Sequence, residues 1–174
     1  EDLFTQRPVP LKFLDALDAQ VSRPRDVAVL SGLSIPFVFV AELLAIAVLF
    51  ALPVSLTVPL LLVVVALVEE LAKSLHVYAV FESDTFPRTR RVALVLGALS
   101  GLGFFVGEKF TAVAQVVGLP ELALGQAAFA PSGIGVFSAA GLLFAPLVLH
   151  VVTAGLTALG ARRDVRWYAA AFVG

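Results

Sequence analysis

Residues 68–76 read Val68-Glu69-Glu70-Leu71-Ala72-Lys73-Ser74-Leu75-His76, in the second half of a run from Leu56 to Val80 that is otherwise almost wholly apolar. The run is long enough to cross a bilayer as a helix. Ionisable side chains are costly at that depth and mark a functional site by default. This stretch therefore predicts a membrane-spanning helix that carries part of a polar site.

The composition supports a membrane protein. The chain has 174 residues, of which 60% are hydrophobic and 14% charged, with a mean hydropathy of +1.00. Soluble domains are less apolar and more highly charged. The chain has no cysteine, which excludes disulfides, thiol nucleophiles and thiolate metal sites. The formal net charge of −1 gives no basic surplus, so nucleic acid is not an expected partner.

Hydropathy divides the chain into two parts. Residues 1–26 form a cytoplasmic or interfacial segment, in which apolar residues at helical spacing predict an amphipathic helix on the membrane surface or against the bundle. Residues 27–174 form an all-α transmembrane domain with an intramembrane polar site. We expect four full spans, at about 27–51, 56–80, 92–117 and 135–160, with a loop, short helix or re-entrant piece at 121–133. The last eight residues, 167–174, suggest a truncated fifth span.

Cationic residues favour one orientation. They cluster before the first span, between the second and third, and after the fourth: Arg23, Arg25, Arg88, Arg90, Arg91, Arg162, Arg163 and Arg166. With four spans these segments share one side of the membrane. The positive-inside rule then predicts a multi-pass protein of the plasma membrane with a cytoplasmic N-terminus.

The second span presents its polar residues in a pattern. Glu69, Lys73 and His76 fall at i, i+4 and i+7 on one helical face, and Glu70 reaches Lys73 at i+3. Two adjacent carboxylates in a low dielectric do not both ionise freely. One charged and one protonated carboxyl group is the arrangement that general acid–base chemistry uses. The alternative is an ion pair with Lys73 that only neutralises itself, and for His76 we expect an interfacial or supporting role.

Two further spans bring polar residues to a similar depth. At about 1.5 Å per residue, Glu69 and Glu70 lie roughly 15 Å from the cytoplasmic end, level with His150, and Glu108 lies somewhat further out. Pairing of Glu108 with Lys109 is not expected, because neighbours on a helix point apart. His150 could instead bond a backbone carbonyl or a threonine.

Two other features of the spans have plainer expectations. Glu42, alone on the first span, is expected to be protonated or paired across the bundle rather than functional. Glycines at small-xxx-small spacing on the third span predict close helix packing: Gly97, Gly101, Gly103 and Gly107.

Three blocks in order carry a family likeness: Glu69-Glu70-x-x-Lys73, then Gly101-x-Gly103-Phe104-x-x-Gly107-Glu108, then His150-x-x-Thr153-Ala154-Gly155. The chain resembles the PrsW family of intramembrane proteases, within a superfamily that includes the CAAX-prenyl endoproteases and bacteriocin-processing proteins. The resemblance covers about residues 56–160. It implies a helical bundle with a catalytic site within the membrane.

The resemblance also implies roles for the site residues. Glu69 or Glu70 would activate a water, while Glu108 and His150 would bind a metal or stabilise the oxyanion. If a metal is used, Zn²⁺ held by Glu70, Glu108 and His150 is the candidate. Lys73 and His76 would support the site. Lys109 stands where the family often has Asn.

Three functions are compatible with these features. The first is an intramembrane endopeptidase that hydrolyses a membrane-protein or membrane-peptide substrate with a Glu-activated water. The second is a non-catalytic scaffold related to the scaffold subunit of γ-secretase. The third is a proton-coupled transporter, in which the same carboxylates relay protons.

Overall fold

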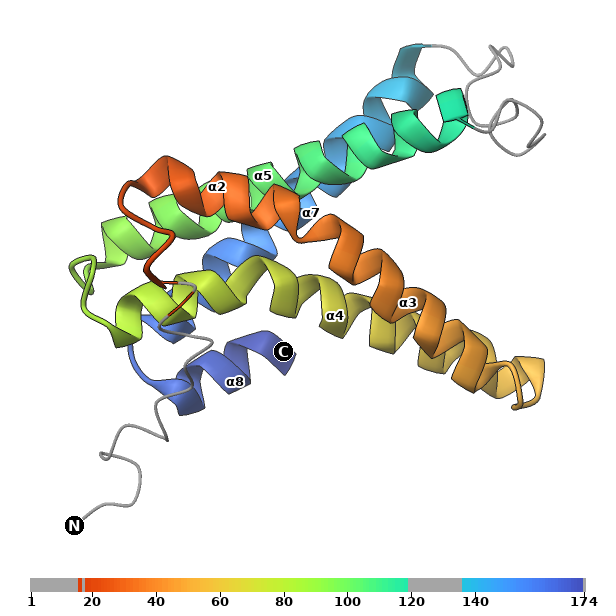
Figure 1. Ribbon diagram of the computed structural model, residues 1–174, viewed down its shortest axis with the longest axis horizontal. Coiled ribbons are helices and arrows are strands. Elements are labelled where there is room, and N and C mark those ends of the chain that lie inside the picture. The colour runs from red at the N-terminus through yellow and green to blue at the C-terminus, as the bar shows by residue number, and fades with distance from the viewer. Residues whose placement is uncertain (1–15, 17, 119–135, 174) are drawn as a thin grey trace.

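The computed structural model describes residues 16, 18–118 and 136–173 and is helical throughout its regular structure (Figure 1). The helices are α2 (Pro24–Leu33), α3 (Ile35–Leu49), α4 (Val54–Glu82), α5 (Arg90–Gly118), α7 (Val136–Ala161) and α8 (Val165–Val173). Four stretches within them are long and apolar enough to cross a membrane: Pro24–Leu49, Val54–Glu82, Arg90–Thr111 and Phe144–Ala161. The prediction of an all-α bundle with four spans is confirmed at this level.

The first span, predicted at about 27–51, is divided by a turn that the sequence analysis did not predict. It consists of α2 and α3, which meet at Ser34. Pro36 stands in the first turn of α3, and its missing N–H makes an uninterrupted helix unfavourable there. Ser34 Oγ donates to the carbonyl oxygen of Ser31 at 2.6 Å and satisfies one acceptor at the break. The break lets α2 pack on α5 while α3 runs beside α4 (Figure 1).

Helix α5 lies between α2 and α7, and its glycines explain how closely. A Cβ atom built on Gly107 would lie 2.6 Å from the carbonyl oxygen of Gly32 in α2. On another face of α5, a Cβ atom on Gly97 would lie 2.5 Å from the carbonyl oxygen of Ala154 in α7. Without side chains at these points the backbones touch, as small residues allow in membrane helices. The predicted packing role of the glycines is confirmed.

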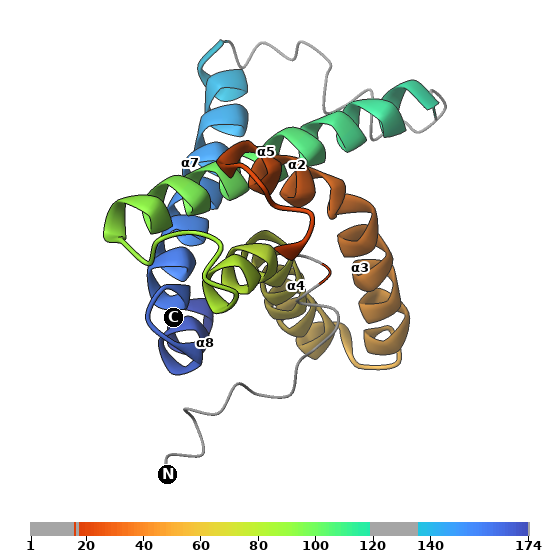
Figure 2. The ribbon, with the colours of Figure 1, turned by 60° about the vertical axis from the view of Figure 1, so that its left-hand side comes forward.

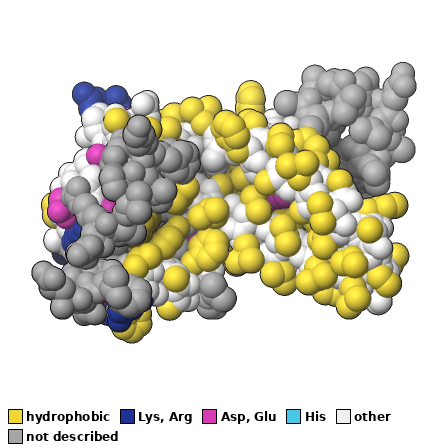
Figure 3. All heavy atoms as spheres, turned by 60° about the horizontal axis from the view of Figure 1, so that its bottom comes forward, with side chains coloured by type: hydrophobic (Ala, Val, Ile, Leu, Met, Phe, Trp, Pro, Cys, Tyr) yellow, Lys and Arg dark blue, Asp and Glu magenta, His cyan; other side chains and the backbone are white. Residues whose placement is uncertain are grey.

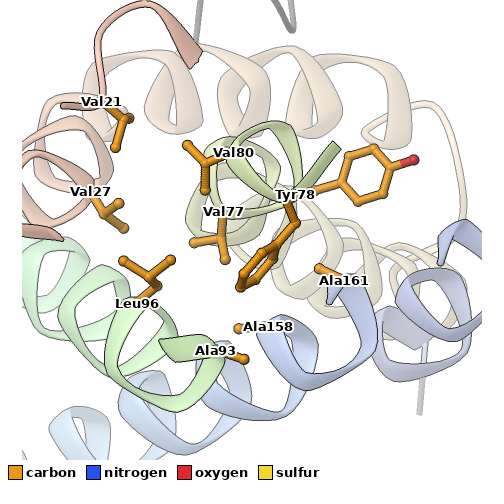
Figure 4. Close-up of a cluster of buried hydrophobic side chains, with 10 residues drawn as sticks. Val21, Val27, Val77, Tyr78, Val80, Ala93, Leu96, Ala158 and Ala161 are labelled. Atoms are coloured by element: carbon orange, nitrogen blue, oxygen red, sulfur yellow. The ribbon is translucent and has the colours of Figure 1, made fainter. Parts of the chain in front are cut away.

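The apolar core lies toward the end of the bundle where α4 ends and α5 begins. It contains ten buried residues (Figure 4): Val21, Val27, Val77, Tyr78, Val80, Phe81, Ala93, Leu96, Ala158 and Ala161. They come from the segment before α2 and from α2, α4, α5 and α7. This core holds the helices together on the C-terminal side of the polar stretch of α4.

Helix α8 has nine residues and folds back against α4 and α7. Its Tyr168 ring stacks on Tyr78 with 4.7 Å between ring centroids, and Tyr168 Oη lies 2.9 Å from Ser74 Oγ. A fifth span at this position stays a prediction. Most of the predicted N-terminal amphipathic helix and all of residues 121–133 lie outside the described residues.

Charge and apolar surface are separated along the bundle. In Figure 3 hydrophobic side chains cover the middle of the face shown, while Lys and Arg appear only near its left end. The predicted basic segments all belong to the end where α2 starts, α4 passes to α5 and α7 passes to α8 (Figure 1). A multi-pass membrane protein fits this distribution. The cytoplasmic placement of the N-terminus stays a prediction.

Candidate functional site

A chain of hydrogen bonds and ion pairs joins α4, α5 and α7. Glu70 Oε2 lies 3.0 Å from Lys73 Nζ, which lies 3.2 Å from His150 Nδ1. His150 Nε2 lies 3.0 Å from Glu108 Oε2. Glu70, Lys73 and His150 are all buried. The sequence-predicted residues Glu70, Lys73, Glu108 and His150 therefore come together, with the lysine between the first carboxylate and the imidazole.

These contacts assign the tautomer of His150. A charged lysine has three donors and no acceptor, so Nδ1 of the imidazole accepts from Lys73. The other nitrogen, Nε2, then carries the proton and donates it to the carboxylate of Glu108. The ring partners of His150 are thus side chains of α4 and α5. The alternative, a ring bonded only to a backbone carbonyl or a threonine, is wrong.

Thr157 extends this series of hydrogen bonds beyond Glu70. The sequence analysis does not name Thr157 as a site residue. Its hydroxyl donates to Glu70 Oε1 at 2.7 Å, and the side chain is almost fully buried. Thr157 follows His150 by seven residues, which is two helical turns and the same face of α7. That spacing was the available signal. With Thr157 on one oxygen and Lys73 on the other, both oxygens of Glu70 are engaged.

Lys109 binds Glu108 at the outer end, which corrects an expectation. Lys109 Nζ lies 2.6 Å from Glu108 Oε1, although neighbours on a helix start in different directions. The long lysine stem turns back over the ring of Phe105, with Nζ 5.3 Å from the ring centroid. Glu108 is consequently held by Lys109 on one oxygen and by His150 on the other.

Phe104 covers the middle of this series of hydrogen-bonded side chains. Its ring is buried, with Lys73 Nζ 5.1 Å from the ring centroid. The centroid of the His150 ring lies 5.2 Å from that of Phe104. The ring face favours the nearby ammonium and limits the positions that the imidazole can take.

Glu69 lies apart from this chain, on a cavity. The cavity has a volume of about 270 Å³ and is lined by Ile35, Val38, Phe39, Glu42, Glu69, Phe104, Glu108 and Thr111. Three of these residues, Glu42, Glu69 and Glu108, are carboxylates from α3, α4 and α5. Water occupies about 30 Å³ per molecule, so the space holds several waters or part of a substrate. Glu42, which the sequence suggested was not functional, lines the same cavity as the predicted site.

His76 belongs to a second polar cluster. Its Nε2 lies 3.2 Å from Ser100 Oγ, which donates to the backbone carbonyl of Lys73 and lies 3.1 Å from Ser31 Oγ. Ser31, His76 and Ser100 are buried between α2, α4 and α5. The cluster ties the backbone of Lys73 to α5. His76 is therefore placed to support the site, and it is buried rather than at the membrane surface.

The predicted metal ligands do not fit a metal ion in this arrangement. Both nitrogens of His150 and both oxygens of Glu70 and Glu108 are directed at protein atoms. The ammonium of Lys73 stands between Glu70 and His150. In the described part of the chain, no three His, Asp or Glu side chains are grouped so that they could hold a metal. The Zn²⁺ expectation stays a prediction, and no step proposed below uses a metal.

Comparison with known proteins gave no match to a family model, to a curated protein or to a solved structure. The resemblance to the PrsW family therefore rests on the three sequence blocks alone.

Proposed function

We propose that this chain is an intramembrane endopeptidase of the glutamate-dependent type, which hydrolyses a membrane-protein substrate with a water activated by Glu69. The observation that carries the proposal is the cavity on which Glu69 and Glu108 meet within the spans. On this cavity Glu69, which forms no ion pair within the described residues, lies beside Glu108, which His150 and Lys109 hold in place. The resemblance to the PrsW family favours the same chemistry.

Glu69 rather than Glu70 is the better base. Glu70 is buried, with one oxygen on Lys73 and the other on Thr157, so these contacts and the surrounding helices leave its carboxylate little access to a water. Glu69 lines the cavity directly. A general base must come within hydrogen-bond distance of the proton that it removes. We therefore assign Glu70 to positioning Lys73, and through it His150.

The proposed reaction has two steps. The carboxylate of Glu69 takes a proton from a water as the water oxygen forms a bond to the scissile carbonyl carbon. The C–N bond of the tetrahedral intermediate then breaks, and the same proton passes from Glu69 to the leaving nitrogen. The oxyanion is assigned to the ammonium of Lys109, which keeps two protons beyond the one directed at Glu108, while His150 Nε2–H holds Glu108 in place.

One substitution tests the assignment. The purified full chain is incubated in proteoliposomes with a panel of transmembrane peptides that carry a fluorophore and a quencher. Removing a general base lowers rates by about 10²–10⁴-fold, so Glu69→Gln should reduce cleavage at least 100-fold. The matched control is Glu82→Gln at the end of α4, which should cleave like the wild type. Cleavage that persists in Glu69→Gln would show that Glu69 is not the general base. Loss of wild-type cleavage on addition of a metal chelator would show that the reaction uses a metal ion.

One observation favours a second function, a proton-coupled carrier. The chain from Lys73 through His150 to Glu108 can pass a proton toward the cavity, because the imidazole accepts at Nδ1 while it donates at Nε2. The same proteoliposomes separate the two functions. Proton-driven uptake of a solute, absent in His150→Ala and with no peptide cleaved by the wild type, would favour the carrier.

A further inference from the structure

A second cavity lies at the basic end of the bundle, away from the polar chain. It has a volume of about 490 Å³ and lies among the start of α5, the end of α7 and α8. Its lining includes three arginines, Arg90, Arg162 and Arg163, together with Trp167. Three cations around one pocket are unusual in a chain with a formal net charge of −1.

The three arginines have no carboxylate partner within the described residues. Arg163 lies over the ring of Trp167, with its guanidinium carbon 4.7 Å from the ring centroid. Arg162 Nε is shielded from solvent and donates to no atom that the structure describes. The nearest acid in sequence, Asp164, accepts the backbone N–H groups of Arg166 and Trp167 through one oxygen.

Arg162 Nε is a buried donor without an acceptor in the described residues, and the exposed Arg90 and Arg163 add two further charges beside it. A buried polar group without a hydrogen-bond partner is destabilising, so each one in a folded protein requires an explanation. Arginine binds phosphate with two parallel hydrogen bonds and is well suited to phosphate recognition. The three charges and the missing acceptor of Arg162 Nε both indicate an anionic ligand with phosphate oxygens.

The remaining walls indicate where the phosphate comes from. Leu156 and Leu159 of α7 and the alanines of α8 line the pocket beside the arginines. Leu156 is more than half exposed although it belongs to a membrane span. Tryptophan is typical of the membrane–water interface. A pocket that is cationic at one side and apolar at the other fits a ligand with a phosphate head and hydrocarbon chains.

We propose that this pocket binds the headgroup of an anionic phospholipid, with the phosphate on Arg90, Arg162 and Arg163 and the acyl chains along Leu156 and Leu159. Basic pockets between membrane helices bind anionic headgroups in this way. The site is separate from the Glu69 cavity and does not depend on the proposed endopeptidase activity.

Trp167 makes the proposal testable, because it is the only tryptophan of the chain. The full chain is placed in phosphatidylcholine nanodiscs that contain a small fraction of bromine-labelled phosphatidylglycerol or bromine-labelled phosphatidylcholine. Bromine on the acyl chains quenches tryptophan on contact. One cation near an anionic lipid favours binding about fivefold, so the apparent association constant of phosphatidylglycerol should exceed that of phosphatidylcholine by about fivefold or more. Equal quenching by the two lipids would overturn the proposal.

The variant Arg90→Gln/Arg163→Gln removes two exposed arginines of the pocket and should abolish the preference. Its quenching is normalised to the same variant in unlabelled lipid, since Arg163 contacts the reporter ring. The matched control, Arg23→Gln/Arg25→Gln, removes two exposed cations from the same end of the bundle and should keep the preference. A preference kept by the first variant, or lost equally in the second, would overturn the proposal.

Inorganic phosphate separates the two sources of the anion. The acyl chains contribute to binding in the proposed site, so millimolar phosphate should leave the quenching by labelled phosphatidylglycerol unchanged. Release of the quenching by phosphate at these concentrations would assign the pocket to a free anion and overturn the lipid assignment.

Discussion

The molecule has two parts that differ in packing, and the boundary between them falls between two adjacent glutamates. We call α2, α5, α7 and the part of α4 from Glu70 onward the packed part, and α3 with residues 54–69 of α4 the open arm. Figure 2 shows the open arm turned away from α5 and α7. From Phe39 to Glu69 no residue is buried, whereas Glu70 and most residues from Lys73 to Phe81 are.

This difference is the reason for proposing different roles for the paired glutamates. Glu70 belongs to the packed part, and its oxygens are satisfied by Lys73 and Thr157. Glu69 stands at the edge of the open arm, where α3 brings Glu42 to the same cavity. A rigid carboxylate positions its neighbours, while one on an accessible cavity can exchange protons with water. In the proposed endopeptidase, adjacent residues of one helix separate support from chemistry.

The largest expected effect is on the buried ion pair of the packed part. Lys73→Met removes the cation between Glu70 and His150 and leaves a buried carboxylate without its partner. Breaking a buried pair costs about 3–5 kcal/mol in the free energy of unfolding. The measurement is reversible unfolding in mixed detergent–SDS micelles, followed by circular dichroism.

Two controls sharpen this prediction. Lys109→Met removes a lysine that is about one-third exposed, so it should cost less than about 1 kcal/mol. The double variant Glu70→Gln/Lys73→Met removes both charges and should recover much of the loss. Equal costs for the two single variants would mean that the buried Glu70–Lys73 pair contributes no more to stability than the partly exposed Glu108–Lys109 pair.

The next effect is on the backbone contact between α5 and α7. A Cβ atom at Gly101 would overlap the carbonyl group of His150, so Gly101→Ala should push the two helices apart. Overpacking costs about 1–3 kcal/mol, and here it also moves the imidazole away from Lys73. Gly155→Ala is the matched control, because its Cβ would meet only Leu94 Cδ2 at 3.9 Å. If both variants unfold alike, the close approach at Gly101 does not constrain the bundle.

The sequence was sufficient for those features that depend on local spacing. Span positions follow from hydropathy, the Glu70–Lys73 pair from an i, i+3 relation, and the close packing of α5 from its glycines. The contacts between helices were not accessible in the same way. The partner of Glu70 on α7, Thr157, and the shared cavity of Glu42 and Glu69 depend on how α3, α4 and α7 rotate about their axes.

One feature that the sequence did not predict, and one wrong expectation, have a local physical origin. Hydropathy predicts the first span correctly, but it does not show the turn at Ser34 that divides the span into α2 and α3 beside Pro36. The ion pair between Glu108 and Lys109 was rejected from the directions of their Cα–Cβ bonds, but a lysine side chain is long enough to turn back. Hydropathy gives the length of a span. It does not tell whether the helix is continuous or where its long side chains point.

The smallest expected effect is on the open arm itself. Leu44 of α3 is 63% exposed, so in a bilayer its side chain contacts lipid in the folded state. Leu44 contacts lipid in the folded and in the unfolded state, so its truncation affects both states alike. Leu44→Ala should therefore change the free energy of unfolding by less than about 0.5 kcal/mol. Leu96→Ala in the packed part is the matched comparison. Leu96 is 1% exposed, so its truncation leaves a cavity and should cost at least about 1 kcal/mol more. Equal costs would show that α3 is covered in the membrane, by a partner or by residues outside the described ranges, and the cavity beside Glu69 would then be closed to a substrate from that side.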